Sequence, residues 1–287
     1  MLKQRIATAI VLLVGLVAAS TLMSPFLFSL FTAVVVLLAA WEWGGFIGLE
    51  NLTTKVAYII SILLLLGGCF LLLELGPATE SLRQDHALTL SSLGLLYWLC
   101  ASLVVLDYPT RNNHWNKESR IATMGIFSLL PTWVGIIQLK YLEPNGMLVL
   151  VLIILVAAVD IGAFFTGMSF GKTKLAPELS PNKTWEGVWG GFALCLLVSV
   201  GLGVVLNLTL FPVGLFEMTV LIIISALVTF FSVTGDLVES MLKRNRKIKD
   251  SGKILPGHGG VLDRIDGLIA ATPVFVLGMT FLVLTAR

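Results

Sequence analysis

Four carboxylates bracket one polar stretch near the C-terminal end of the chain. Asp236 and Glu239 precede the stretch and are three residues apart, and Asp263 and Asp266 follow it with the same spacing. Residues three or four apart share one face of a helix, so we expect each pair, with Ser240 beside the first, to project from one side of its helix. Carboxylates at the edge of apolar segments need a counter-ion, and ligands that are all oxygen favour Mg²⁺ over zinc.

Two interpretations of these carboxylates need no metal. Asp263 and Asp266 would then cap the N-terminus of a helix, and the first pair would form ion pairs with Lys243 or Arg244. The sequence leaves these interpretations open.

The stretch between the two pairs is basic and rich in glycine. It contains "KRNRKIKD" and "PGHGG". A basic run usually reflects topology or attraction to anionic lipids, but beside a carboxylate–metal centre it becomes a candidate phosphate site. The residues singled out for that site are Lys243, Arg244, Lys249, Gly259, Gly260 and Arg264. For His258, between two glycines, a structural and a functional role are both open.

A second polar stretch, residues 169–187, carries Lys172 and Lys183 as further phosphate-binding candidates. Its "GMSFGKT" is not a P-loop, because three residues rather than four separate the glycines and an apolar helix rather than a strand precedes them. The alternative is that these lysines only mark the membrane orientation. Asp160 lies inside the preceding apolar run, where an ionisable group is costly and therefore a functional candidate. The alternative is that it reaches the interface.

The segments around these residues have the composition of membrane-spanning helices. The chain has 287 residues, of which 57% are hydrophobic and 13% charged, about half the charge of a soluble domain. We predict an all-α, polytopic membrane protein of about nine spans, and prefer a retained first span to a cleaved signal peptide. The predicted spans are 6–23, 25–43, 56–75, 88–106, 121–139, 147–168, 188–210, 213–235 and 266–285.

Charge predicts the orientation. With a cytoplasmic N-terminus, 16 of the 19 Lys and Arg residues fall on the cytoplasmic side, as the positive-inside rule requires. The long loops 169–187 and 243–264 then face the cytoplasm. We expect one membrane domain, with N-terminal spans in residues 1–140 and a catalytic region in 141–287. A net charge of +2 and the lack of a basic, aromatic patch exclude a nucleic-acid partner.

The segment "SMLKRNRKIKDSGKILPGHGGVLDRID", Ser240–Asp266, closely resembles the signature of the phosphatidate cytidylyltransferases, also called CDP-diglyceride synthases, in their bacterial form. The matching positions are Ser240, Lys243, Arg244, Lys249, Asp250, Pro256, His258, Gly259, Gly260, Asp263, Arg264 and Asp266. "DIGAFFTG", "FGKTKLAP" and "SPNKTWEG" also resemble that family. The first half of the chain resembles it only as a series of spans.

The resemblance implies that CTP and phosphatidate react to give CDP-diacylglycerol and pyrophosphate. It also implies Mg²⁺, with a monovalent cation such as K⁺ sharing the carboxylate site, an inner-membrane location with the active site facing the cytoplasm, and a homodimer. In our hypothesis Asp236 and Asp263 hold the metal, with Glu239, Ser240 and Asp266 close by. The residues placed at the phosphates are Lys243, Arg244, Lys249, Arg264, Lys172 and Lys183, with His258 near a phosphate or ligand and Asp160 as a further metal residue.

Three other functions compete with this interpretation. A secondary transporter also has carboxylates within the membrane, but it should show paired halves and a site at the midplane. A polyprenol kinase would transfer the γ-phosphate of CTP and release CDP. A CDP-alcohol phosphotransferase is disfavoured because its Asp-Gly-x-x-Ala-Arg signature is absent from the sequence.

Overall fold

The computed structural model describes residues 2–109, 115–257 and 259–285. Within them two short strands, β1 (Lys174–Ala176) and β2 (Ser180–Thr184), form an antiparallel hairpin. The helices are α1 (Leu2–Leu22), α2 (Pro25–Ile47), α3 (Leu52–Leu72), α4 (Gln84–Leu106), α6 (Glu118–Leu142), α7 (Met147–Phe170), α8 (Trp185–Thr209), α9 (Leu215–Asn245) and α10 (Leu262–Thr285). The predicted all-α, polytopic membrane fold is confirmed.

The described helices follow the predicted spans in order. Eight of them, from α2 to α10, are long and apolar enough to cross a membrane, and α1 has a shorter apolar segment, Ile10–Leu22. The largest difference in boundaries is at α9, which continues to Asn245, ten residues beyond the predicted end of that span. The extension keeps an apolar stripe, because Leu237, Val238 and Met241 remain buried among the neighbouring helices.

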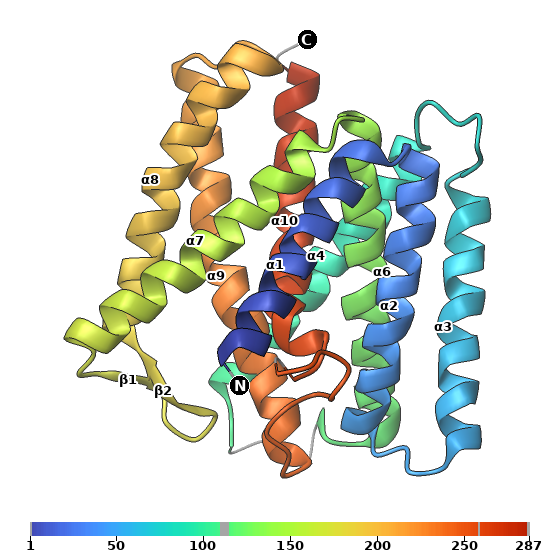
Figure 1. Cartoon of the computed structure of the whole chain (residues 1–287), viewed down its shortest axis with the longest axis vertical. Helices are drawn as coiled ribbons and strands as arrows, with labels where there is room; N and C mark the ends of the chain where they lie inside the picture. Colours follow the sequence, from blue (N-terminus) through green and yellow to red (C-terminus); the bar gives the residue numbers. More distant parts are fainter. Residues whose placement is uncertain (1, 110–114, 258, 286–287) are drawn as a thin grey trace.

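Successive helices run in opposite directions, so the connections gather at two ends of the bundle (Figure 1). The start of α1, the β1–β2 hairpin and the described residues 246–257 and 259–261, which we call the loop 246–261, lie at one end, the hairpin end (Figure 1). Helix α10 finishes at the other end (Figure 1). This alternation is the one assumed when the 16 basic residues were assigned to one side.

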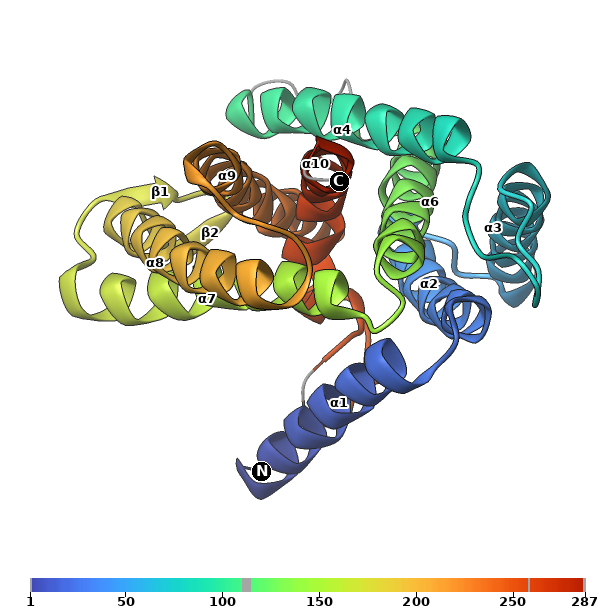
Figure 2. The same cartoon turned by 90° about the horizontal axis from the view of Figure 1, so that it is seen from above.

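Helix α10 occupies the middle of the bundle, beside α9, α6 and α4 (Figure 2). Its span is 72% buried, whereas that of α3, at the edge of the bundle, is 22% buried. Helix α10 therefore packs against protein on most sides, and side chains at its first turn are held in place by their neighbours.

Two glycines bring α9 and α10 close together beside the predicted carboxylates. A Cβ on Gly235 would lie 2.3 Å from the backbone oxygen of Asp266, and a Cβ on Gly267 would lie 2.5 Å from the Ser232 hydroxyl oxygen. Small residues allow such close helix packing. Because Asp236 follows Gly235 and Asp266 precedes Gly267, this packing places the two carboxylates beside each other.

The hairpin leads directly into α8 through a local cap. The Thr184 hydroxyl accepts a hydrogen bond from the Gly187 N–H at 3.2 Å, which satisfies one of the free donors of the first turn. The Glu186 carboxylate accepts hydrogen bonds from the N–H groups of Lys172 and Thr173, each at 3.1 Å. The segment 171–184, which we call the hairpin segment, is thus tied mainly to the start of α8.

Candidate active site

Lys243 joins the two predicted carboxylate pairs. Its ammonium group lies 2.6 Å from Glu239 Oε2 on the same helix and 2.8 Å from Asp263 Oδ1 at the start of α10. All three side chains are largely shielded, with 16% of Lys243, 6% of Glu239 and 8% of Asp263 exposed. In such surroundings an unpaired charge is costly, so the three groups depend on one another.

The loop of residues 246–261 wraps around the Asp263 carboxylate. Asp263 Oδ2 accepts hydrogen bonds from the Ser251 N–H at 2.9 Å, the Ser251 hydroxyl at 3.0 Å and the Gly260 N–H at 2.8 Å. Gly259 has a φ of 84°, which L side chains rarely adopt. This glycine lets the chain turn so that the next N–H points at Asp263. The carboxylate is thereby fixed from two directions.

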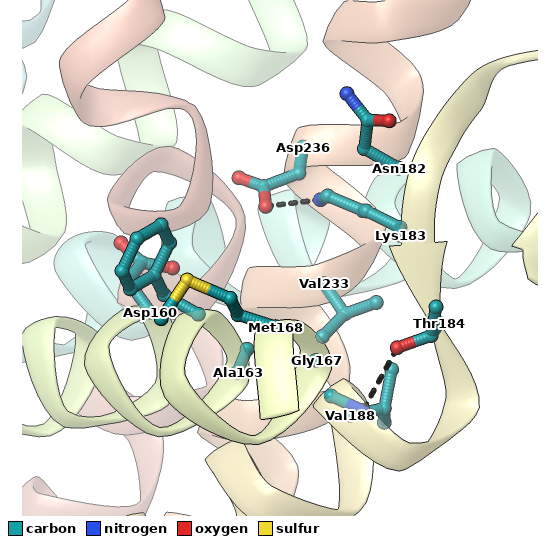
Figure 3. A pocket seen from close by; sticks show the side chains of 12 residues that line it. Asp160, Ala163, Gly167, Met168, Asn182, Lys183, Thr184, Val188, Val233 and Asp236 are labelled. Carbon is teal, nitrogen blue, oxygen red and sulfur yellow. Dashed lines mark hydrogen bonds and ion pairs between the residues drawn. The ribbon is translucent and has the colours of Figure 1, made fainter. Parts of the chain in front are cut away.

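A cavity of about 380 Å³ lies next to this cluster, between α7, α8, α9 and the hairpin segment. Lys183 from β2 reaches across it and forms an ion pair with Asp236 on α9 (Figure 3). Asp160 from α7 lines the same cavity with apolar neighbours such as Phe164 and Met168. The cavity combines a charged end with an apolar wall.

The remaining carboxylates are close to this ion pair. Asp266 lies within electrostatic range of Asp236 and Glu239, and Asp160 lies within range of Asp236, Lys183 and Arg264. Residues from α7, α9, α10 and the hairpin segment, far apart in sequence, therefore meet at the hairpin end of the bundle.

A second cavity, of about 570 Å³, is formed by the loop 246–261 itself. Its lining is polar and includes three of the predicted phosphate-binding residues, Lys249, Gly259 and Arg264. Asp250 and Lys253 also line it. Arg264, in the first turn of α10, lines this cavity and lies within electrostatic range of Asp160, which lines the smaller one.

Other predicted residues lie outside these cavities. The Lys172 side chain is exposed, and the nearby contacts of its segment are made by the backbone. Arg244 is exposed and its Nε donates to the Leu179 carbonyl at 3.2 Å, linking α9 to the hairpin segment. Ser240 is half-buried on α9. His258 lies outside the described residues, so its role stays a prediction.

Comparison with known proteins agrees with this arrangement. The model of the Cytidylyltransferase family matches residues 3–282. The chain belongs to the cytidylyltransferase family. Similar proteins named phosphatidate cytidylyltransferase include one from Pseudomonas aeruginosa, 42% identical over 275 residues that cover 96% of each chain. One from Haemophilus influenzae is 40% identical over 288 residues that cover 96% of this chain and 97% of the relative.

A third relative of that name, from Bacillus subtilis, is 32% identical over 232 residues, covering 78% of this chain and 81% of the relative. The resemblance found in the sequence, and the prediction of a nucleotidyltransferase, are thus confirmed. The matches also include the first half of the chain, where the sequence shows only a series of spans.

Cytidylyltransferase chemistry brings phosphates and their counter-ions together, so the fit of a metal to these carboxylates matters. In the described part of the chain, no three His, Cys, Asp or Glu side chains are gathered closely enough to hold a metal as they stand. Instead, the ammonium groups of Lys183 and Lys243 contact the carboxylates. The donors are all oxygen, and Glu239 Oε1 is buried without a hydrogen-bond partner among the described residues. A hard cation such as Mg²⁺ fits that donor set.

Sequence reasoning missed one buried carboxylate of this cytidylyltransferase, Glu42 on α2. It is 3% exposed, and its Oε2 accepts a hydrogen bond from the Leu262 N–H at the start of α10 at 2.9 Å. The available signal was its position, an ionisable residue between Trp41 and Trp43 within a predicted span. The same rule drew attention to Asp160.

Proposed function

We propose that this chain transfers the cytidylyl group of CTP to phosphatidate, giving CDP-diacylglycerol and pyrophosphate. The observation that carries the proposal is the convergence of Asp236, Lys183, Lys243 and Asp263 on one site at the end of a membrane bundle. The names of the relatives, which match along almost the whole chain, support the same reaction.

The phosphate of phosphatidate needs no strong base to become a nucleophile. A phosphomonoester has a second pKa of about 6, as in phosphoserine, so the phosphate group is largely doubly ionised at neutral pH. The main obstacle is repulsion between two anions. Lys183 and Lys243 can neutralise phosphate charge during attack on the α-phosphorus and loss of pyrophosphate. Both side chains sit where carboxylates already hold them.

The two cavities suit different substrates. We assign the loop cavity, with Lys249, Lys253 and Arg264, to the CTP phosphates. We assign the smaller cavity to the phosphatidate head group, because Phe164 and Met168 give it an apolar wall while Lys183 and Asp236 form its polar end. The acyl chains would remain in lipid, and the first turn of α10 would lie between the two substrates.

Mg²⁺ is the proposed cofactor, with a monovalent cation such as K⁺ as a second ion. In place of Asp236 with Asp263, we assign the divalent ion to Asp236, Glu239 and Asp266, with Asp263 Oδ1 and Asp160 at its edge, because Asp263 Oδ2 already accepts three hydrogen bonds. These carboxylates would have to move closer together on binding, since no three of the described ones are gathered closely enough as they stand. When bound, the ion would neutralise charge on the reacting phosphates. Lys183 and Lys243 would then exchange carboxylate contacts for phosphate contacts.

We further propose that the hairpin end faces the cytoplasm, that the bilayer is the inner membrane and that the enzyme is a homodimer. The positive-inside rule supports the orientation, since the order of the spans in the sequence assigns 16 of the 19 Lys and Arg residues to the side of the N-terminus and of the loops 169–187 and 243–264. The dimer rests on the family resemblance alone.

The decisive experiment incubates the purified protein with phosphatidate vesicles and CTP labelled at the α-phosphorus. We expect label in the lipid product, release of pyrophosphate, and loss of both when EDTA removes divalent ions. Release of CDP with no label in lipid would instead identify a kinase. Substrate uptake into liposomes without either product would identify a transporter.

A further inference from the structure

Both ends of the loop 246–261 are attached to α2, a helix of the N-terminal half. At the far end of the loop, Glu42 Oε2 accepts a hydrogen bond from the Leu262 N–H at 2.9 Å, and it accepts another from the hydroxyl of Ser251, within the loop, at 3.2 Å. A Cβ on Gly260 would lie within 2.6 Å of the same carboxylate. The loop thus packs directly on Glu42, with room for little more than a hydrogen atom.

Arg246 makes the attachment at the near end of the loop. Its Nε donates to the Phe46 carbonyl at 2.7 Å, and its Nη2 donates to the Ile47 carbonyl. These carbonyls belong to the last turn of α2, one turn beyond Glu42, and the last carbonyls of a helix lack partners within the helix. The last two turns of α2 therefore bind a residue at the start of the loop and residues at its end.

Ser251 connects this attachment to the site. Its hydroxyl lies 3.2 Å from Glu42 Oε2 and 3.0 Å from Asp263 Oδ2. A hydroxyl has one proton to donate, so the two carboxylates share it. Asp263 also accepts hydrogen bonds from the Ser251 and Gly260 N–H groups. Gly260 packs on Glu42, and the Leu262 N–H donates to it. A shift of Glu42 would thus change the hydrogen bonds that orient Asp263.

We propose that Glu42 is a positioning residue for cytidylyl transfer. Glu42 and Arg246 clamp the loop to α2, and through Ser251 and Gly260 they hold the Asp263 carboxylate in its working orientation. The role of Asp263 in this statement rests on the proposed function, whereas the clamp itself does not. On this proposal the N-terminal half supplies part of the geometry of the active site.

Glu42→Gln in the full chain, in detergent, tests the proposal. It keeps the size of the side chain and removes its charge. We expect kcat per folded enzyme to fall about tenfold or more, and KM for CTP to rise as well, since the loop that Glu42 holds also forms the CTP cavity. Lys247, Lys249 and Lys253 are exposed in the loop, and we expect trypsin to cut there faster than in the wild type.

Glu143→Gln is the matched control. Glu143 is also buried, at 5% exposure, and accepts the backbone N–H groups of Asn145 and Met147 at the start of α7, at the opposite end of the bundle. We expect this variant to melt at a lower temperature while keeping its kcat and its rate of loop cleavage. A shared response of both glutamates would show a general stability effect and overturn the proposal.

Ser251→Ala provides a second variant if Glu42→Gln does not fold. It removes the shared hydroxyl and leaves α2 intact, and we expect a smaller loss of kcat and a smaller rise in KM for CTP than in Glu42→Gln. Wild-type kcat in the folded variant that is tested, Glu42→Gln or Ser251→Ala, would overturn the positioning role. If the wild type itself makes no CDP-diacylglycerol, the proposed function fails, while the rate of loop cleavage in Glu42→Gln still reports on the clamp.

Discussion

The hairpin segment 171–184 and the loop 246–261 both deliver residues to the site, but they are held in different ways. The hairpin segment is tied mostly to residues nearby in sequence, through Glu186 and the Thr184 cap. The loop is tied to α2, some 200 residues earlier in the chain, through Arg246 and Glu42.

The two kinds of attachment suit two requirements of the proposed chemistry, a cation that can change partners and a carboxylate that keeps its orientation. The Lys183 and Asp236 side chains are 29% and 23% exposed, more than those of Lys243 and Asp263, so Lys183 can exchange Asp236 for a phosphate at a lower cost. Asp263 is enclosed and receives three hydrogen bonds on one oxygen, which suits a group whose orientation must not change. The candidate site therefore combines a more exposed cation, Lys183, with a firmly held carboxylate, Asp263.

The largest effect is expected at the fixed carboxylate. Asp263→Asn keeps the size of the side chain but removes the charge that faces Lys243 and the phosphates. We expect the incorporation of CTP to fall about 100-fold or more, while the protein still inserts and folds. Steady-state rates and size-exclusion profiles of the purified variant measure this, and full activity in a folded Asp263→Asn would rule out the assigned role.

A change in the α9–α10 contact is expected to rank second. In Gly235→Ala the new Cβ would collide with the Asp266 backbone oxygen, so we expect a loss of stability of about 1–3 kcal/mol and reduced activity per folded enzyme. Gly201→Ala on α8 is the control, because a Cβ there meets no atom within 4 Å. Thermal unfolding in detergent compares them, and equal melting temperatures would contradict the close contact.

The hairpin segment offers a matched pair of lysines for the smallest effect. Both Lys172 and Lys183 are predicted from the sequence to bind substrate, but only Lys183 of the two lines a described cavity. We expect Lys183→Gln to lower kcat/KM about tenfold or more, the loss of one charge-assisted contact, and Lys172→Gln to change it less than about twofold. Equal losses in the two variants would show that the hairpin acts as a diffuse positive surface.

The parts of the site that the sequence could predict are those encoded over short distances. The i, i+3 spacing of Asp236 with Glu239, and of Asp263 with Asp266, already placed each pair on one helix face. The basic loop between them followed from composition. The partners of Glu42 and the different surroundings of Lys172 and Lys183 were not predictable, because each depends on contacts between elements that spacing does not encode.

The sequence by itself determined that the protein spans a membrane, the order of its spans and the family to which it belongs. Apolar block length reflects the thickness of a bilayer, the distribution of Lys and Arg predicts orientation, and the segment Ser240–Asp266 carries the family resemblance. The tertiary structure decided which groups meet. Close packing at Gly235 and Gly267 sets Asp236 beside Asp266, and the end of α2 reaches the loop, because a buried charge is stable only where distant partners satisfy it.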